Sequence, residues 1–274
     1  VGGLEPHRRY EYKAGIKFGG KKIEQIEKVP KYWPNSDNIK TDILDYAFEI
    51  EYFDSHLVRI LNELEKRNLL ENTIIVVTSD NGMPFPRVKG QVFPYDNRLP
   101  LAIRWGKGIK NPGRVINDFV SFSDFTPTFL ELARVDLANH KMEDFSGVSW
   151  RDIFNDKLIN NKRDYIIIGK ERHDVGREND NGYPVRGIIT DQYFYSINFK
   201  YERWPAGNPE TGYLNTDGSP TKSEILNLRR KGINENYWNL SFGKRDHETL
   251  YDLKKDPDCI ENIAKFDKYT FLKD

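Results

Sequence analysis

The sequence predicts an α/β fold with a smaller antiparallel subdomain toward the C-terminal end. A long helical pattern is followed at once by a run of β-branched residues, and helical and extended patterns keep alternating up to about residue 155. Beyond residue 160, short extended runs alternate with turns rich in Gly, Asn and Asp, which is typical of an antiparallel sheet. We therefore predict two domains, residues 1–158 and 159–274.

The first element with a clear period is a helix. Residues 1–38 are rich in Gly, Lys and Pro and predict loop with short elements. From Ile39 to Leu64, apolar residues recur at steps of three and four. This spacing predicts one long amphipathic helix that ends near Asn68.

A strand follows this helix. Residues 73–78 are a β-branched run, and an apolar strand after a helix is typical of a central parallel strand covered on both faces. Further short strands are predicted at residues 101–104 and 118–121. Thr126 and Pro127 then predict the start of another helix, as its N-cap and first helical residue.

The C-terminal part carries four predicted strands. Asp191 and Gln192 separate two apolar runs and predict a tight hairpin between them. The four strands are predicted at residues 165–168, 186–190, 193–198 and 249–253.

Composition excludes several classes of protein. Lys plus Arg and Asp plus Glu both number 42, so the formal charge is zero, which argues against a dedicated nucleic-acid binder. The longest apolar stretches have four or five residues, far below the roughly 20 that a membrane span needs. With Cys259 as the single cysteine, the chain forms no intrachain disulfide and no cysteine-based zinc cluster.

A polar motif follows the first predicted strand. In open α/β sheets ligands bind beyond the carboxyl ends of strands, where Ser79, Asp80, Asn81 and Gly82 are expected to lie. Asp80 and Asn81 offer hard oxygen donors of the kind that Ca²⁺ or Mg²⁺ prefers, but Ca²⁺ takes six to eight oxygens. The same residues are also typical of an ordinary turn.

The run from Asn72 to Gly90 resembles the second metal-binding motif of the type I sulfatases, in the alkaline phosphatase superfamily. The resemblance is greatest to the sulfamidase-like branch, which includes related bacterial polysaccharide sulfatases. Further segments agree in the same order along the chain. They are Glu5-Pro6-His7-Arg8, Ser123 to Thr128, and Leu250 to Leu253 with Asp256-Pro257 and Glu261-Asn262.

This resemblance implies a partial alkaline phosphatase-like mixed sheet flanked by helices. It also implies a hydrolase of sulfate esters or sulfamates on sulfated saccharides, with Ca²⁺, or Mg²⁺ in its place, held partly by Asp80 and Asn81. The family's nucleophile is a formylglycine made within a Cys/Ser-x-Pro-x-Arg motif, which this sequence does not contain. The chain therefore resembles the C-terminal half to two-thirds of a sulfatase. Its expected partners are the N-terminal half of the catalytic domain and the saccharide substrate.

The resemblance also implies roles for individual side chains. Lys89 matches a basic residue that binds sulfate, although Arg87 is a nearby competitor. His7 matches a histidine at the sulfate or leaving group, and an imidazole can donate a proton near neutral pH. Arg8 either holds substrate or pairs with a carboxylate, and both alternatives remain open.

A second group of candidates lies at the start of the C-terminal part. His173 and Asp174 follow a predicted strand, where the sulfamidase-like branch places contacts to the leaving group. Such a loop suits recognition of sugar hydroxyl or amine groups. The alternative interpretation is a solvated charge cluster.

Two classes of function therefore stay open. The first is a hydrolase portion that is inactive alone, from an enzyme acting on glycosaminoglycan-like substrates in a secreted, periplasmic or lysosomal setting, as relatives of the family do. The second is a non-catalytic, truncated module that binds a sulfated glycan or a partner chain. Among enzymes, a phosphatase or phosphonate hydrolase of the same superfamily is the alternative, although the C-terminal signature favours a sulfatase.

Overall fold

The computed structural model describes residues 2–136, 142–157 and 163–272. The chain divides into two units, and each is described by itself. Unit 1 comprises Val1–Leu61, Ser79–Pro100 and Ile167–Asp274, and unit 2 comprises Asn62–Thr78 and Leu101–Ile166. The fold is mixed α/β with two separate sheets, as predicted. The predicted domain boundary between residues 158 and 159 lies outside the described residues and stays a prediction.

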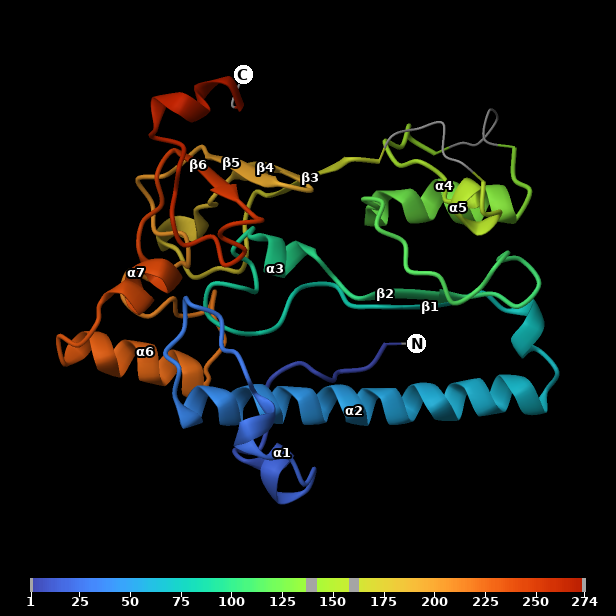
Figure 1. The fold of residues 1–274 in the computed structure, drawn as a ribbon, viewed down its shortest axis with the longest axis horizontal. Helices are drawn as coiled ribbons and strands as arrows, with labels where there is room; N and C mark the ends of the chain where they lie inside the picture. Colours follow the sequence, from blue (N-terminus) through green and yellow to red (C-terminus); the bar gives the residue numbers. More distant parts are fainter. Residues whose placement is uncertain (1, 137–141, 158–162, 273–274) are drawn as a thin grey trace. The chain divides into compact units, whose positions relative to one another are not determined.

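Unit 1 is organised around the N-terminal part of helix α2 (Asp37–Lys66), blue in Figure 1. Its bounds confirm the helix predicted from the apolar period. The segment before it contains the short helix α1 (Ala14–Lys17), which lies against α2. A Cβ on Gly15 would come within 2.5 Å of the Leu44 carbonyl oxygen, so only glycine permits this approach.

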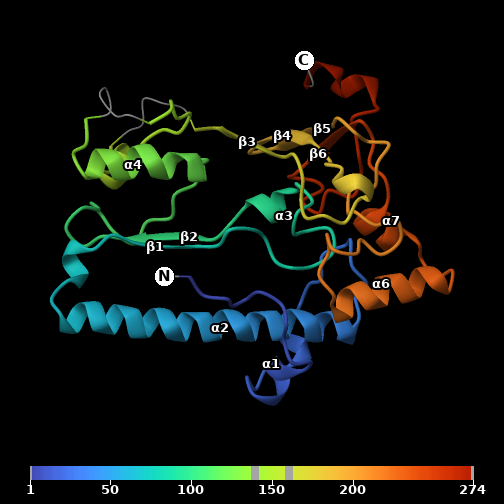
Figure 2. The same cartoon turned by 180° about the vertical axis from the view of Figure 1, so that it is seen from behind.

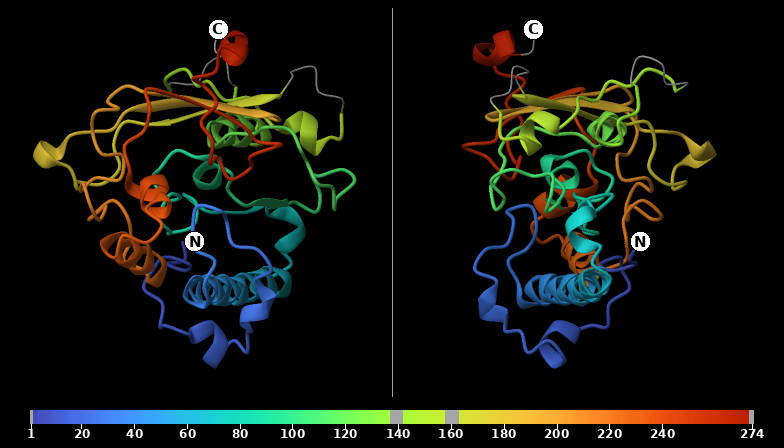
Figure 3. Two further views of the ribbon diagram at one scale, coloured as in Figure 1. Left: turned by 60° about the vertical axis from the view of Figure 1, so that its left-hand side comes forward. Right: turned by 90° about the vertical axis from the view of Figure 1, so that its right-hand side faces the viewer.

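The core of unit 1 joins α2 with helices α6 (Pro220–Arg230) and α7 (Asn236–Phe242). Each helix contributes a side chain that is at most 1% exposed: Ile39, Ile225 and Phe242. Figure 3 shows α6 beside the N-terminal end of α2. Trp33 completes the core, and its indole N–H donates to the Pro86 carbonyl at 2.9 Å. This contact anchors the segment after β1 to the core.

The second part of unit 1 is a four-stranded sheet with the order β3-β4-β5-β6, visible from behind in Figure 2. The pairs β4–β5 and β5–β6 are antiparallel. Residues 191 and 192 join β4 to β5, which confirms the predicted hairpin. The strands are β3 (Tyr165–Lys170), β4 (Val185–Thr190), β5 (Tyr193–Asn198) and β6 (Glu248–Asp252), and the first two residues of β3 belong to unit 2.

Unit 2 contains the other sheet. Strand β1 (Ile75–Thr78) pairs antiparallel with β2 (Leu101–Arg104), so that Ile75 faces Arg104. The predicted parallel, fully covered strand is therefore wrong for β1, which is only half-buried along its length. The physical reason is that the chain turns back through residues 79–100 and lays β2 alongside β1. Residues 118–121 form no strand.

Helix α4 (Phe125–Leu132) begins earlier than Thr126, which corrects the predicted N-cap. A 3₁₀ turn, Phe122–Asp124, precedes it, and Ser121 and Asp124 form a capping box there. Asp124 accepts from the Ser121 N–H at 2.9 Å and from the Trp150 indole at 3.0 Å. The short helix α5 (Arg151–Phe154) begins immediately after Trp150.

The remaining helical elements are short. No helix in the described part of the chain is long and apolar enough to cross a membrane. The remaining short helical elements are α3 (Pro94–Asn97) and the 3₁₀ turns Ile23–Gln25, Leu70–Asn72, Glu178–Asp180 and Asp267–Leu272.

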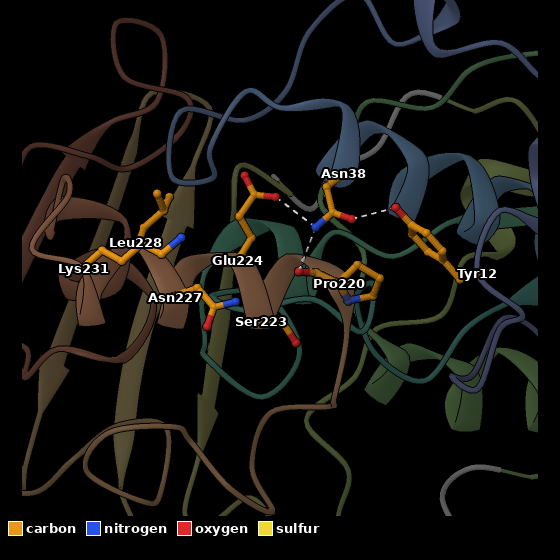
Figure 4. Close-up of a pocket in the computed structure, with 8 residues that line it drawn as sticks. All are labelled: Tyr12, Asn38, Pro220, Ser223, Glu224, Asn227, Leu228 and Lys231. Atoms are coloured by element: carbon orange, nitrogen blue, oxygen red, sulfur yellow. Dashed lines mark hydrogen bonds between the residues drawn. The ribbon is translucent and has the colours of Figure 1, made fainter.

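A chain of polar contacts links the N-terminal loop, α2 and α6 (Figure 4). The Tyr12 hydroxyl donates to the Asn38 amide oxygen at 2.9 Å. The Asn38 amide nitrogen donates to Glu224 at 2.9 Å and to the Pro220 carbonyl at 3.3 Å. These residues line an open cavity of about 550 Å³ on α6. None of the sequence-predicted site residues lines it.

A buried ion pair makes the second link between the same elements. Arg8 donates to both oxygens of Asp42 on α2, at 2.7 and 3.0 Å. Asp42 also accepts from the Thr221 hydroxyl at 2.6 Å and from its N–H at 3.2 Å. The side chains of Arg8 and Asp42 are 7% and 1% exposed. One carboxylate thus joins the N-terminal loop, α2 and the first turn of α6.

We predict that Asp42→Ala lowers the free energy of unfolding by about 3 to 5 kcal/mol, because it leaves a buried guanidinium without its counter-ion. Urea unfolding of the full chain measures this change. The control is Glu63→Ala, which removes an exposed carboxylate paired with Lys66 and is expected to cost at most about 1 kcal/mol. Equal losses in the two variants would contradict the role assigned to Asp42.

Candidate functional site

The segment that leads into the fold and the segment after β1 meet at Lys89, within unit 1. The Lys89 ammonium lies 3.4 Å from His7 Nε2, although 82 positions separate the two residues. On another side it lies 3.3 Å from Asp217 Oδ2. The Lys89 side chain is 16% exposed. The sequence-predicted catalytic pair, His7 and Lys89, is therefore brought together, with Asp217 as an additional neighbour.

The proton position on His7 follows from its other neighbour. His7 Nδ1 lies 2.7 Å from the Arg8 carbonyl oxygen, which can only accept a hydrogen bond. Nδ1 therefore carries a hydrogen, and the neutral ring presents the lone pair of Nε2 to Lys89. In this arrangement Lys89 is the donor and His7 the acceptor. The ring is exposed to solvent and accessible to a ligand.

Arg87, the competitor of Lys89 for anion binding, has a structural position. Its side chain donates to the Leu240 carbonyl at 2.6 Å and to the Cys259 carbonyl. The guanidinium lies 4.2 Å from the centroid of the Phe93 ring, and the residue is 1% exposed. An anion in solvent cannot reach it. Of the two basic residues, Lys89 is the one that lies at the accessible site.

Arg8, like Arg87, is bound to groups within the protein. Besides its two bonds to Asp42, its Nε donates to the Pro84 carbonyl at 2.7 Å. The structure therefore shows carboxylate pairing, the second of the two alternatives for this residue. Arg8 fixes His7 and the segment around Pro84 relative to each other.

Asp96 on α3 clamps the loop that carries Lys89, and sequence reasoning missed it. Its carboxylate accepts from the Gly82 N–H at 3.2 Å and from the Gly90 N–H at 2.8 Å. Burial raises the pKa of Asp96, although these two N–H groups partly offset the effect. No pattern in the sequence marks this residue, because its partners are backbone groups.

Gly90 is the point where the sugar-binding candidate His173 meets the loop. Gly90 has a φ of +72°, and a Cβ there would come within 2.4 Å of the His173 ring. Lys170 on β3 donates to the Gly90 carbonyl. Burial lowers the pKa of His173, and the charges of Lys170 and Lys89 lower it further. Burial, followed by the charge of Arg177, lowers the pKa of Lys170 to about 7.

His173 and Asp174 lie on the loop between β3 and β4. Asp174 is exposed with a φ of +55°, and its carboxylate accepts from the Val175 N–H at 2.7 Å. The histidine therefore lies beside the Lys89 loop, whereas the aspartate lies on the exposed side of its own loop.

Asp80 and Asn81 provide two oxygen donors just after β1. The Asn81 amide nitrogen donates to the Gly82 carbonyl at 2.8 Å, which leaves the side-chain oxygen without a donor among the described residues. Asp80 is exposed and makes no contact of this kind within the described chain. The pair fits two of the six to eight ligands of Ca²⁺. Nowhere in the described ranges do three His, Cys, Asp or Glu residues form a metal-binding group.

Known sequences are similar to this chain over most of its length. Residues 6–135 match the family described as Sulfatase. An ulvan-active sulfatase of Formosa agariphila is 28% identical over 250 residues, covering 88% of this chain and 38% of the relative. The human N-sulphoglucosamine sulphohydrolase is 24% identical over 260 residues, covering 89% of this chain and 48% of the relative. The chain thus spans less than half the length of these relatives.

A solved structure shows the same fold. The phosphonate monoester hydrolase of Agrobacterium radiobacter matches with a TM-score of 0.60 at 19% identity, covering 88% of this chain and 40% of that one. At this identity the likeness concerns the fold alone. Residues 6–135 thus carry a match to the Sulfatase family, and the relatives that align over most of the chain are sulfatases of more than twice the aligned length.

Proposed function

We propose that this chain is part of a sulfatase that hydrolyses sulfate esters or sulfamates on sulfated saccharides. The observation that carries the proposal is the approach of His7 Nε2 to Lys89 Nζ at 3.4 Å. A half-buried ammonium beside an accessible imidazole suits a sulfate group, because the ammonium supplies charge and both groups supply hydrogen-bonding atoms. The named relatives act on ulvan and on N-sulphoglucosamine, which supports a saccharide as the carrier.

The contacts support the following proposed roles. Lys89 binds sulfate oxygens, and His7 faces the sulfate or the leaving group. Arg8 positions His7 through Asp42 rather than contacting the substrate. His173 and Asp174 contact the sugar from the β3–β4 loop. In the neutral ring, His7 Nε2 accepts from Lys89, so His7 would supply a proton to the leaving group only after Nε2 has itself been protonated.

Such a site would need two further groups that these residues do not supply, a metal ion and a nucleophile. Asp80 and Asn81 would hold Ca²⁺, or Mg²⁺ in its place, together with ligands from elsewhere. The bound metal would add positive charge at the sulfate oxygens. A formylglycine nucleophile would come from outside this chain, in the N-terminal half of the catalytic domain. We therefore expect this chain alone to be inactive, and its compartment to be secreted, periplasmic or lysosomal.

Two other functions are separable by experiment. A phosphonate or phosphate hydrolase is supported by the shared fold of the phosphonate monoester hydrolase. A non-catalytic module would bind a sulfated glycan or a partner chain without turnover. The parent protein is the full-length protein to which we propose that this chain belongs. Parallel assays of the parent protein with a sulfated disaccharide and with a phosphonate monoester distinguish these two functions from the proposed sulfatase. The proposal expects sulfate release as the dominant reaction.

We predict that Lys89→Ala in the parent protein lowers kcat/KM for a sulfated saccharide by about 10²-fold or more, because the transition state loses a preorganised cation. Lys89→Arg should retain more activity than the alanine variant. Lys254→Ala, which removes an exposed lysine paired with Asp191 on the sheet, is the charge-matched control. Full activity of Lys89→Ala would remove the central support for the proposed site.

Metal binding gives an independent prediction. In the parent protein, Asp80→Ala should abolish the rise in Tm that Ca²⁺ produces, because a ligand that binds only the folded state stabilises it. Asn81→Ala removes a neutral ligand and should have a smaller effect. Asp191→Ala on the exposed hairpin serves as the control. If both site variants keep the wild-type Ca²⁺ response, the motif is only a turn.

The loop between β3 and β4, which carries His173 and Asp174, gives a prediction about specificity. Every substrate presents the same sulfate group, so discrimination among sugars falls to the surrounding loops. The double variant His173→Ala, Asp174→Ala should lower turnover of the saccharide far more than turnover of a small aryl sulfate. Assays with the two substrates side by side measure the difference. An equal loss on both would place these residues at the sulfate itself, and no loss on either would make them ordinary surface.

A further inference from the structure

Lys89 has an acidic neighbour to which neither the sequence motifs nor the proposed chemistry gives a role. Asp217 lies in the segment just before α6, and its Oδ2 is 3.3 Å from Lys89 Nζ. The two side chains are 16% and 27% exposed, so water screens their attraction only in part. The charge of Lys89 is therefore already partly neutralised without any ligand.

The contact is electrostatic and lacks a hydrogen bond. Asp217 Oδ2 is buried and accepts no hydrogen bond from any residue in the described chain. A buried carboxylate oxygen without a donor is costly, and Lys89 is the cation placed to offset that cost. Lys222, whose pKa is also sensitive to the charge of Asp217, instead donates its ammonium to the Thr216 carbonyl at 2.6 Å. Asp217 therefore depends chiefly on Lys89.

We propose that Asp217 is an internal counter-anion that competes with sulfate for Lys89. A sulfate dianion that approaches Lys89 also approaches the carboxylate, and like charges repel. Free inorganic sulfate lacks the sugar contacts with which a saccharide-bound sulfate offsets this repulsion. Asp217 thus weakens retention of the released ion and favours the substrate over the product. This inference rests on the proposed role of Lys89 in sulfate binding.

The charges of Lys89 and Asp217 also act on His173, in the loop between β3 and β4. The charge of Lys89 lowers the pKa of His173, whereas the charge of Asp217 raises it. The ring of His173 also packs against Gly90, next to Lys89 in the chain. The pKa of His173 therefore reports on the charges of Lys89 and Asp217. Removal of the carboxylate should lower the pKa of His173 further if the local structure is retained.

The experiment measures binding of inorganic sulfate to the full chain by isothermal titration calorimetry at constant ionic strength. Asp217→Asn keeps the shape of the side chain and removes its charge, and it should tighten sulfate binding by roughly tenfold, the scale of one partly screened charge contact. Asp217→Ala should act in the same direction. Asp191→Asn removes an equal charge at an exposed position, 84% accessible, and should leave the affinity unchanged.

The outcomes separate this inference from the proposed function. NMR titration first shows whether the pKa of His173 falls further in the Asp217 variants. If it does, and sulfate binding is unchanged or weaker in both variants, the proposed role of Asp217 as a counter-anion is overturned. If that pKa does not fall, Lys89 and Asp217 are not coupled in solution, which also overturns it. Lys89→Ala tests the underlying site: sulfate binding that survives this change refutes the proposed role of Lys89, whatever the Asp217 variants do.

Discussion

The carboxylate of Asp42 is the constraint on which the site depends. It is 1% exposed, and it accepts four hydrogen bonds from Arg8 and Thr221. Arg8 also donates to the Pro84 carbonyl, so the buried Arg8–Asp42 pair connects three chain segments with α2. His7 adjoins Arg8, and Asp217 lies four positions before Thr221. The Arg8–Asp42 ion pair therefore positions the side chains around Lys89, although none of those side chains takes part in it. Breaking such a buried ion pair lowers the free energy of unfolding more than breaking an exposed one.

A second constraint acts on the loop that carries Lys89. Arg87 and Val92 have φ values of +70° and +55°, which are unfavourable for side chains with a Cβ. Such backbone persists only where surrounding contacts determine it. Here the buried Arg87 donates to two carbonyl groups, and Asp96 holds the N–H groups at both ends of the loop. The Lys89 ammonium is thus presented by a backbone that is held before any ligand arrives, as a preorganised binding site requires.

The elements that could be predicted from sequence are those whose cause is local. Helix α2 follows from a period of apolar residues, and the turn between β4 and β5 follows from two polar residues between extended runs. The antiparallel partner of β1 could not be predicted in this way, because strand pairing depends on how the chain returns. The approach of His7 to Lys89 was expected only through a family resemblance. Asp96 and Asp217 carry no sequence signal, since their partners are backbone groups or a lysine more than a hundred positions away.

The charges near the site also limit how it can select its ligand. Burial moves the pKa of Lys170 down to about 7 and lowers that of His173, and Asp217 neutralises part of Lys89. The positive charge available to an anion is therefore smaller than the number of basic residues suggests. The depressed pKa of Lys170 also means that the unfolded chain binds its proton more tightly, so this group makes the fold more stable as pH rises from about 7 toward 10. A site with so little net charge holds a bare anion weakly, and most of its selectivity must come from contacts to the sugar.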